Sequence, residues 1–124
     1  KRDWGHAEDF VEAQWLILQK DNPDDYVIST GIQYSVKDFV NLVAKKLNID
    51  LKWEGSGLNE VGIDNETKNT IIKVSKKYFR PAETDSLIGD YKKANEILGW
   101  KPKKNINDLI SEMINEDLKK INSI

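Results

Sequence analysis

The sequence predicts an α+β fold, with helices packed against short strands in a single domain spanning residues 1–124. Two observations carry this prediction. Apolar side chains recur at helical spacing in three stretches, near 7–20, 35–47 and 107–121, and short β-rich runs lie between them. The length of 124 residues suits one domain with its own core, and no internal repeat or linker divides the chain.

The first helix is predicted from about residue 7 to 20, because apolar side chains recur at spacings of four and three: Val11, Trp15 and Leu18. The run Asn22-Pro23-Asp24-Asp25 breaks it. The β-rich run at 26–30, closed by Gly31, then predicts a short strand.

The second helix is the most regular element. Ser35 suits the N-cap, and Asp38 three residues later resembles a weak capping box. The apolar stripe that follows has a helical period and comprises Val36, Phe39, Val40, Val43, Ala44 and Leu47.

The middle of the chain predicts strands. Apolar and polar residues alternate over 49–54, as in a half-buried strand, and 70–74 is a further strand candidate. The polar stretch 58–69 between them predicts an excursion or hairpin. Residues 78–81 should be extended, because a residue before proline avoids the α region.

Two helices are expected near the C-terminus. Asp90 can cap a short helix through Leu98, with Gly99 as the natural residue after it and Pro102 blocking continuation. A last helix is predicted over 107–121, with one apolar side formed by Ile110, Met113, Ile114, Leu118 and Ile121.

Composition excludes several kinds of chemistry. There is no cysteine and only one histidine, His6, so thiolate nucleophiles, disulfides and multi-histidine metal sites are excluded, and we expect no metal site. The formal net charge of −2 argues against nonspecific binding to nucleic acid or an anionic membrane. No apolar run approaches the ~20 residues of a membrane span. No G-x-G-x-x-G turn, P-loop or G-x-S-x-G elbow occurs.

Two arginines are candidate ligand contacts. Arg2, in Arg2-Asp3-Trp4, can offer a planar fork of donors to a diphosphate or carboxylate, or it can be a terminal arginine in solvent. Arg80 precedes a proline that stiffens its loop, and with Glu83 it could bind an anion and a hydroxyl pair together. The alternative for Arg80 and Glu83 is a surface ion pair.

Other conspicuous residues favour structural roles. His6 is more often a hydrogen-bonded structural residue than a ligand, and Asp9 is favourable at a helix N-terminus whatever its other role. Trp15, Trp53 and Trp100 are expected to anchor the core.

Together these segments resemble a known family. The stretch from Arg2 to Trp15 closely resembles the R-D-W-G-H-A-x-D-[YF]-V-x-A-M-W segment of GDP-mannose 4,6-dehydratases, with Gln14 in place of the usual Met. The resemblance continues, in order, through 23–31, 35–40, 53–55, 57–60, 62–64, 78–85, 89–90, 93–94 and 98–102. The combination of the first segment with the segment from Arg80 to Glu83 is specific, whereas Leu98-Gly99-Trp100 alone occurs in many extended short-chain dehydrogenases/reductases.

The resemblance implies which part of an enzyme this is. Such dehydratases have an N-terminal Rossmann domain, which binds NADP and carries the Tyr-x-x-x-Lys pair, and a smaller C-terminal domain that binds the sugar nucleotide. This sequence resembles only the second part. The resemblance therefore implies a GDP-mannose-binding domain without catalytic residues or a bound cofactor, whose missing partner is the Rossmann domain.

By resemblance, Arg2 and Arg80 would contact the GDP diphosphate and Glu83 would lie near the ribose hydroxyls. The complete enzyme would be a cytoplasmic homo-oligomer. Two alternatives remain open: the same domain of a related sugar-nucleotide epimerase or dehydratase, and a stand-alone, non-enzymatic binding or interaction module.

Overall fold

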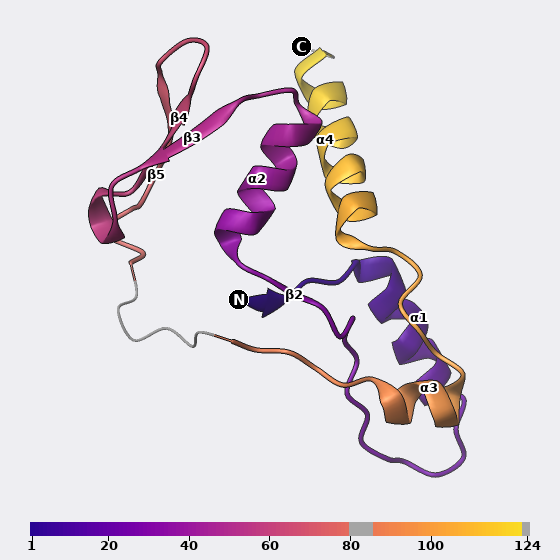
Figure 1. The fold of residues 1–124 in the computed structure, drawn as a ribbon. Coiled ribbons are helices and arrows are strands. Elements are labelled where there is room, and N and C mark those ends of the chain that lie inside the picture. Colours follow the sequence, from indigo (N-terminus) through magenta and orange to yellow (C-terminus); the bar gives the residue numbers. More distant parts are fainter. Residues whose placement is uncertain (80–85, 123–124) are drawn as a thin grey trace. The chain divides into compact units, whose positions relative to one another are not determined.

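The computed structural model describes residues 1–79 and 86–122 and confirms the α+β class. Figure 1 shows the elements along the chain. In order they are β1 (Arg2–Asp3), α1 (Ala7–Leu18), β2 (Gln33–Tyr34), α2 (Val36–Lys46), β3 (Leu51–Glu54), the 3-10 helix η1 (Gly57–Asn59), β4 (Val61–Asp64), β5 (Thr70–Lys73), α3 (Lys92–Leu98) and α4 (Ile106–Asn122). The chain forms two compact units, one of Lys1–Val36 with Asp85–Ile124 and the other of Lys37–Thr84.

The first unit is assembled around a small core. Ala13 of α1, Ala94 of α3 and Trp100 just after α3 are buried together. Partly buried hydrophobic residues pack against them: Phe10, Leu16, Tyr26, Ile28, Tyr91 and Leu98. Two alanines at the centre let the helices approach closely enough for one tryptophan to fill the space between them.

The two-stranded sheet of this unit joins residues far apart in the sequence. β1 pairs antiparallel with β2, so that Arg2 lies opposite Tyr34 and Asp3 opposite Gln33. Trp4 strengthens the join, because its indole Nε1–H donates to the Tyr34 carbonyl over 3.1 Å. This pairing fixes the backbone at the very start of the chain.

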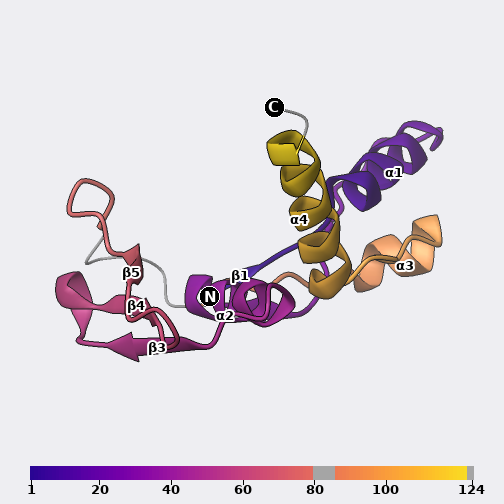
Figure 2. The same ribbon diagram turned by 90° about the horizontal axis from the view of Figure 1, so that it is seen from above.

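The second unit contains an antiparallel sheet of order β3-β4-β5, which Figure 2 shows from above. The excursion or hairpin expected over 58–69 is a hairpin between β4 and β5, preceded by η1. Trp53 of β3 donates from Nε1 to Asn41 of α2 over 2.7 Å, and Lys37 lies 4.8 Å from the centre of the Trp53 ring. This side-chain cluster connects α2 to the sheet.

The structure confirms the helices and strands whose patterns are local. The helices predicted from 7, 35 and 107 are α1, α2 and α4, and the predicted strands 49–54 and 70–74 are β3 and β5. Gly99 adopts the left-handed conformation (φ +68°) after α3. Asp90 acts one residue before the cap position, where its Oδ1 accepts from the Lys92 N–H over 2.9 Å.

Three expectations are wrong. Residues 26–30 form no strand, since they have no ladder partner within 1–79 and 86–122. Tyr78, at the start of the segment 78–81, is part of a turn, closed by its N–H on the Ser75 carbonyl, and is therefore not extended. Arg80 and Pro81 of that segment lie outside the described residues. Trp15 is 60% exposed and anchors no core, because α1 buries the side of the helix that carries Ala13.

Candidate functional site

Arg2 is the one predicted ligand residue that lies within the described chain. It is half-buried on β1, and its guanidinium donates to the Lys1 carbonyl over 2.9 Å. Arg80 and Glu83 lie outside the described residues. The local geometry around Arg2 is therefore the part of the site that can be built from contacts.

Asp3, the neighbour of Arg2, collects hydrogen bonds from two distant segments. Its Oδ1 accepts from the Thr30 N–H (2.8 Å) and the Thr30 hydroxyl (2.5 Å), and its Oδ2 accepts from the Gly31 N–H (2.8 Å) and the Gly89 N–H (3.3 Å). Gly31 has φ +77°, a conformation that glycine adopts without strain. One carboxylate thus connects β1 to two distant segments, residues 30–31 and Gly89.

His6 caps α1 and reaches α4. Its Nδ1 accepts from the Glu8 N–H over 3.0 Å, which satisfies one of the free donors at the start of the helix. Its Nε2 lies in a very short contact with Glu112. Because Nδ1 is an acceptor, the neutral ring carries its proton on Nε2 and donates it to the Glu112 carboxylate. His6 is therefore hydrogen-bonded at the start of α1, as expected.

Asp9 is a buried carboxylate, only 3% exposed. Its Oδ2 accepts from the main-chain N–H groups of Lys103 (3.1 Å) and Lys104 (3.0 Å), just before α4. Its carbonyl accepts from Trp100 Nε1 over 2.9 Å. Sequence reasoning placed Asp9 at the start of the helix but missed this fastening role, since its partners are more than ninety positions away.

Charged groups between α1 and α4 form a small network. Lys104 Nζ lies 2.9 Å from Glu8 and 2.5 Å from Glu112. The ammonium of Lys104 and, to a lesser extent, His6 lower the pKa of Glu112 below its ordinary value, and the two carboxylates raise the pKa of Lys104. The network ties the first turn of α1 to the segment ahead of α4 and to Glu112 of α4.

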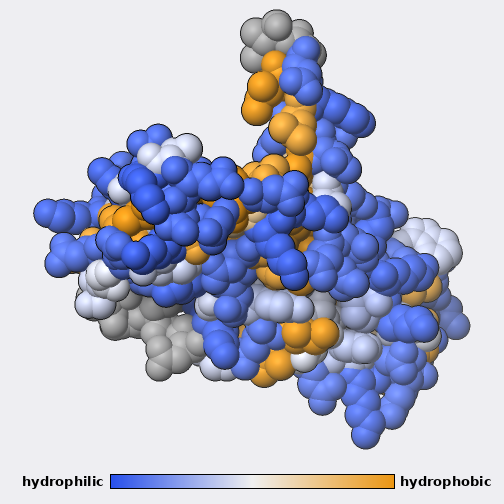
Figure 3. Space-filling view, turned by 45° about the horizontal axis from the view of Figure 1, so that its top comes forward, coloured by the Kyte–Doolittle hydropathy of each residue, from blue (hydrophilic) through white to orange (hydrophobic). Residues whose placement is uncertain are grey.

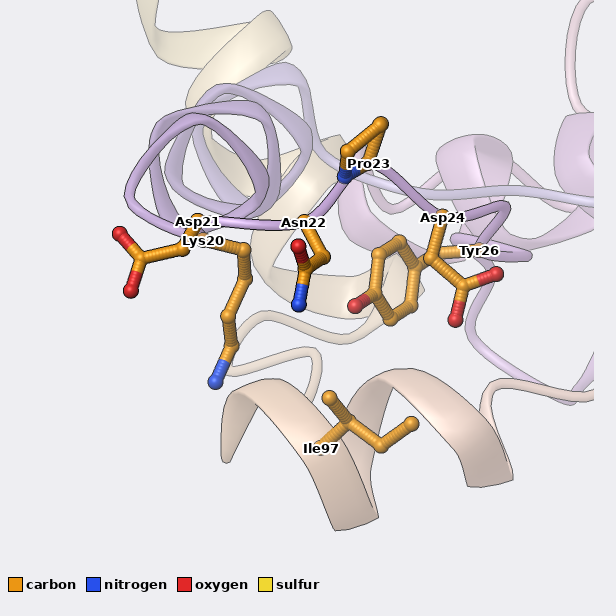
Figure 4. Close-up of a pocket in the computed structure, with 7 residues that line it drawn as sticks. All are labelled: Lys20, Asp21, Asn22, Pro23, Asp24, Tyr26 and Ile97. Atoms are coloured by element: carbon orange, nitrogen blue, oxygen red, sulfur yellow. The ribbon is translucent and has the colours of Figure 1, made fainter.

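Among the described residues, the first unit carries two hollows. Figure 4 shows the first, of about 330 Å³, between the segment from Lys20 to Tyr26 and Ile97 of α3. Asp24 and Lys93 flank it as an ion pair at 2.8 Å, which lowers the pKa of Asp24. The second, of about 280 Å³, is lined by His6 and the α4 residues Leu109, Glu112, Met113, Glu116 and Asp117. Neither hollow includes Arg2.

Within residues 1–79 and 86–122, no group of three or more His, Cys, Asp or Glu side chains is arranged to hold a metal ion. Over the same ranges, each helix is too short or too polar to cross a membrane.

The chain is similar to proteins of known family. The family model described as GDP-mannose 4,6 dehydratase matches residues 1–113. The chain is 47% identical to the GDP-mannose 4,6 dehydratases of Drosophila melanogaster and Homo sapiens, over 95% of its length and 30% and 32% of theirs. It is 43% identical to that of Vibrio cholerae, over 95% of its length and 34% of that protein. The chain thus spans about a third of these relatives, and it belongs to the GDP-mannose 4,6 dehydratase family.

Proposed function

We propose that this chain is the sugar-nucleotide-binding domain, residues 1–124, of a GDP-mannose 4,6-dehydratase, and that it is not catalytic alone. The observation that carries the proposal is the family match over residues 1–113 combined with coverage of only 30–35% of the relatives. Arg2, Arg80 and Glu83 are the residues proposed to bind GDP-mannose.

The chemistry of these side chains suits a sugar nucleotide. An arginine presents several N–H donors in a rigid plane that matches phosphate oxygens, and a carboxylate accepts hydrogen bonds from the paired hydroxyls of a ribose. Arg2 stands on a strand whose backbone is paired to β2 and flanked by the Asp3 and Trp4 contacts. The backbone of Arg2 is therefore already ordered before an anion binds, and binding does not have to order it.

The described residues do not fit the cofactor that the family implies. A dinucleotide needs a glycine-rich turn that leads into the N-terminus of a helix. Here Gly55 and Gly57 lead into η1, a single 3-10 turn of three residues. NADP would supply the hydride chemistry of the complete dehydratase, in which C4 is oxidised, water is lost across C5 and C6, and C6 is reduced. No step of it is assigned to this chain.

The surface of the first unit supports a missing partner, which we propose to be the Rossmann domain. Val11, Trp15 and Leu18 are spaced along one face of α1 and are 61%, 60% and 79% exposed. Figure 3 shows hydrophobic residues exposed among hydrophilic ones on one face of the protein. Residues 26–30 carry a strand-like sequence without a strand partner in the described chain, and the buried Ser29 hydroxyl has no hydrogen-bond partner there. A partner domain could cover the apolar face of α1, and a sheet with a free edge could pair with the unpaired strand sequence.

The remaining finer features of the proposal follow the resemblance. The complete enzyme would bind GDP-mannose, work in the cytoplasm and assemble as a homo-oligomer.

The test uses the complete protein that contains this chain. Arg80→Ala should weaken GDP binding by roughly ten- to a hundred-fold, because a charge-assisted, bidentate contact is lost. Arg80→Lys should recover only part of this, because an ammonium keeps the charge but lacks the fork. Lys119→Ala, on the exposed end of α4, is the control with the same change of charge. GDP titration by calorimetry decides it, and equal dissociation constants in all four proteins would remove Arg80 from the site.

A further inference from the structure

The Asp3 carboxylate is more heavily hydrogen-bonded than a surface acid next to an arginine needs to be. Four donors from Thr30, Gly31 and Gly89 surround it, and the Arg2 guanidinium is not among these partners. The chain also makes room for this arrangement at Gly89. A Cβ built there would lie 2.5 Å from the Ser29 Cβ, so a larger residue would push the Gly89 N–H away from Asp3.

The geometry of β1 places the side chains of Arg2 and Asp3 on opposite faces of the strand but joins them through one backbone. Successive side chains of a strand point to opposite faces, so the Asp3 side chain faces the 30–31 turn and Arg2 takes the other face. On the C-terminal side, Trp4 is bonded to the Tyr34 carbonyl. The backbone that carries Arg2 is therefore held by the ladder, by Asp3 and by Trp4.

The negative charge of Asp3 is unfavourable next to an arginine that is proposed to bind an anion. A carboxylate close to an anion-binding arginine opposes the binding of an anion by Coulomb repulsion. An acid is therefore unfavourable for binding at this position unless its hydrogen bonds to the neighbouring segments contribute more than its charge costs.

We propose that Asp3 is a positioning residue for Arg2: its carboxylate fixes β1 against the 30–31 turn and Gly89, so that Arg2 presents its guanidinium to the diphosphate of a nucleotide sugar. This inference rests on the proposed function, in which Arg2 is a diphosphate contact. Asp3 itself does not touch the ligand.

The experiment is a double-mutant cycle in the complete protein, with GDP as the probe and calorimetry as the readout. Arg2→Ala should weaken GDP binding at least about tenfold. Asp3→Asn should weaken it by a similar factor, because its NH2 group replaces one of the two accepting oxygens and faces either the donors of Thr30 or those of Gly31 and Gly89. The double variant should be no more than about twofold weaker than Arg2→Ala alone, since positioning has no value without the positioned group.

Two further variants control for the change of charge and for a loss of folding. Asp25→Asn makes the same change of charge at an exposed position and should leave the affinity unchanged or slightly stronger. Thr30→Val removes one donor and leaves the carboxylate, and should give a smaller weakening, of about two- to fivefold, even if Asp3→Asn fails to fold.

The outcomes separate the two proposals. If Arg2→Ala weakens binding while folded Asp3→Asn and Thr30→Val bind GDP as tightly as the unchanged protein, Asp3 is not a positioning residue and the proposed function stands. Additive losses in the double variant would also overturn the inference. If Arg2→Ala itself has no effect, the assignment of Arg2 in the proposed function fails, and the inference fails with it.

Discussion

Replacing Asp9 tests the strongest long-range connection of the first unit. The carboxylate is nearly fully buried, and its Oδ2 accepts two main-chain N–H bonds, from Lys103 at 3.1 Å and Lys104 at 3.0 Å. In Asp9→Ala both donors lose a charged acceptor in a part-buried environment. In Asp9→Asn the amide oxygen can still accept from both, so only the charge is lost.

The magnitude follows from the two bonds. A hydrogen bond to a charged group contributes about 1.5–3 kcal/mol, and water can partly replace the acceptor at these part-buried donors. We expect Asp9→Ala to lower the free energy of unfolding by about 3 kcal/mol and Asp9→Asn by about 1 kcal/mol. At about 4 °C per kcal/mol, the melting temperature of the Ala variant should fall by about 12 °C. Urea unfolding followed by circular dichroism measures the free energies of unfolding, and thermal unfolding measures the melting temperatures.

The control is Glu12→Gln, one turn further along α1. Glu12 pairs with the Lys103 ammonium at the surface, where an ion pair contributes about 0–1 kcal/mol. If Asp9→Ala destabilises the chain no more than Glu12→Gln does, then the buried carboxylate does not fasten the segment ahead of α4, and the reasoning from burial and bond count is wrong.

Two further predictions concern charge and exposure. Lys104 and His6 lower the pKa of Glu112 below 4.5, so the contribution of Glu112 to stability is complete above pH 4.5 and is lost as pH falls through its folded-state pKa. Glu112→Gln should therefore reduce the fall of the melting temperature at acid pH. The exposed control Glu116→Gln should leave that fall unchanged. Trp100→Ala should cost about 3–5 kcal/mol of stability and Trp15→Ala less than about 1 kcal/mol, since the side chains are 1% and 60% exposed. Denaturant titration measures these two stabilities. Analytical ultracentrifugation should also show that Trp15→Ala reduces self-association of the isolated chain, and unchanged association would argue against the α1 face as an exposed interface.

The elements that could be predicted are those whose signal lies within one segment. The stripe of α2, the alternation of β3 and the glycine after α3 each depend on neighbours a few positions apart, and each is found in the structure. A periodic apolar stripe shows which side of a helix avoids water. It does not show what covers that side, which is why Trp15 was placed in the core although the described chain leaves it exposed.

The failures arise where pairing is not local. A strand is defined by its partner, so the β-rich composition of 26–30 could not reveal that the described chain supplies none. Conversely, β1 and β2 are two residues each and carry no pattern, yet they pair across about thirty positions. The Asp3 and Asp9 bonds were invisible for the same reason, because their donors are backbone N–H groups that every sequence contains.

Asp3 and Asp9 show how acids and arginines divide their roles in the segment that begins at Arg2. A carboxylate only accepts, so it suits places where loops converge and leave main-chain N–H groups without partners. A guanidinium only donates, so it cannot satisfy those groups and remains suited to anions. Asp3 and Asp9 are accordingly bonded to main-chain N–H groups of distant segments, whereas Arg2 is bonded to a carbonyl next to the chain start. Substitution of Asp9 should therefore appear first as lost stability, substitution of Arg2 as lost affinity, and only Asp3, which adjoins the arginine, should change both.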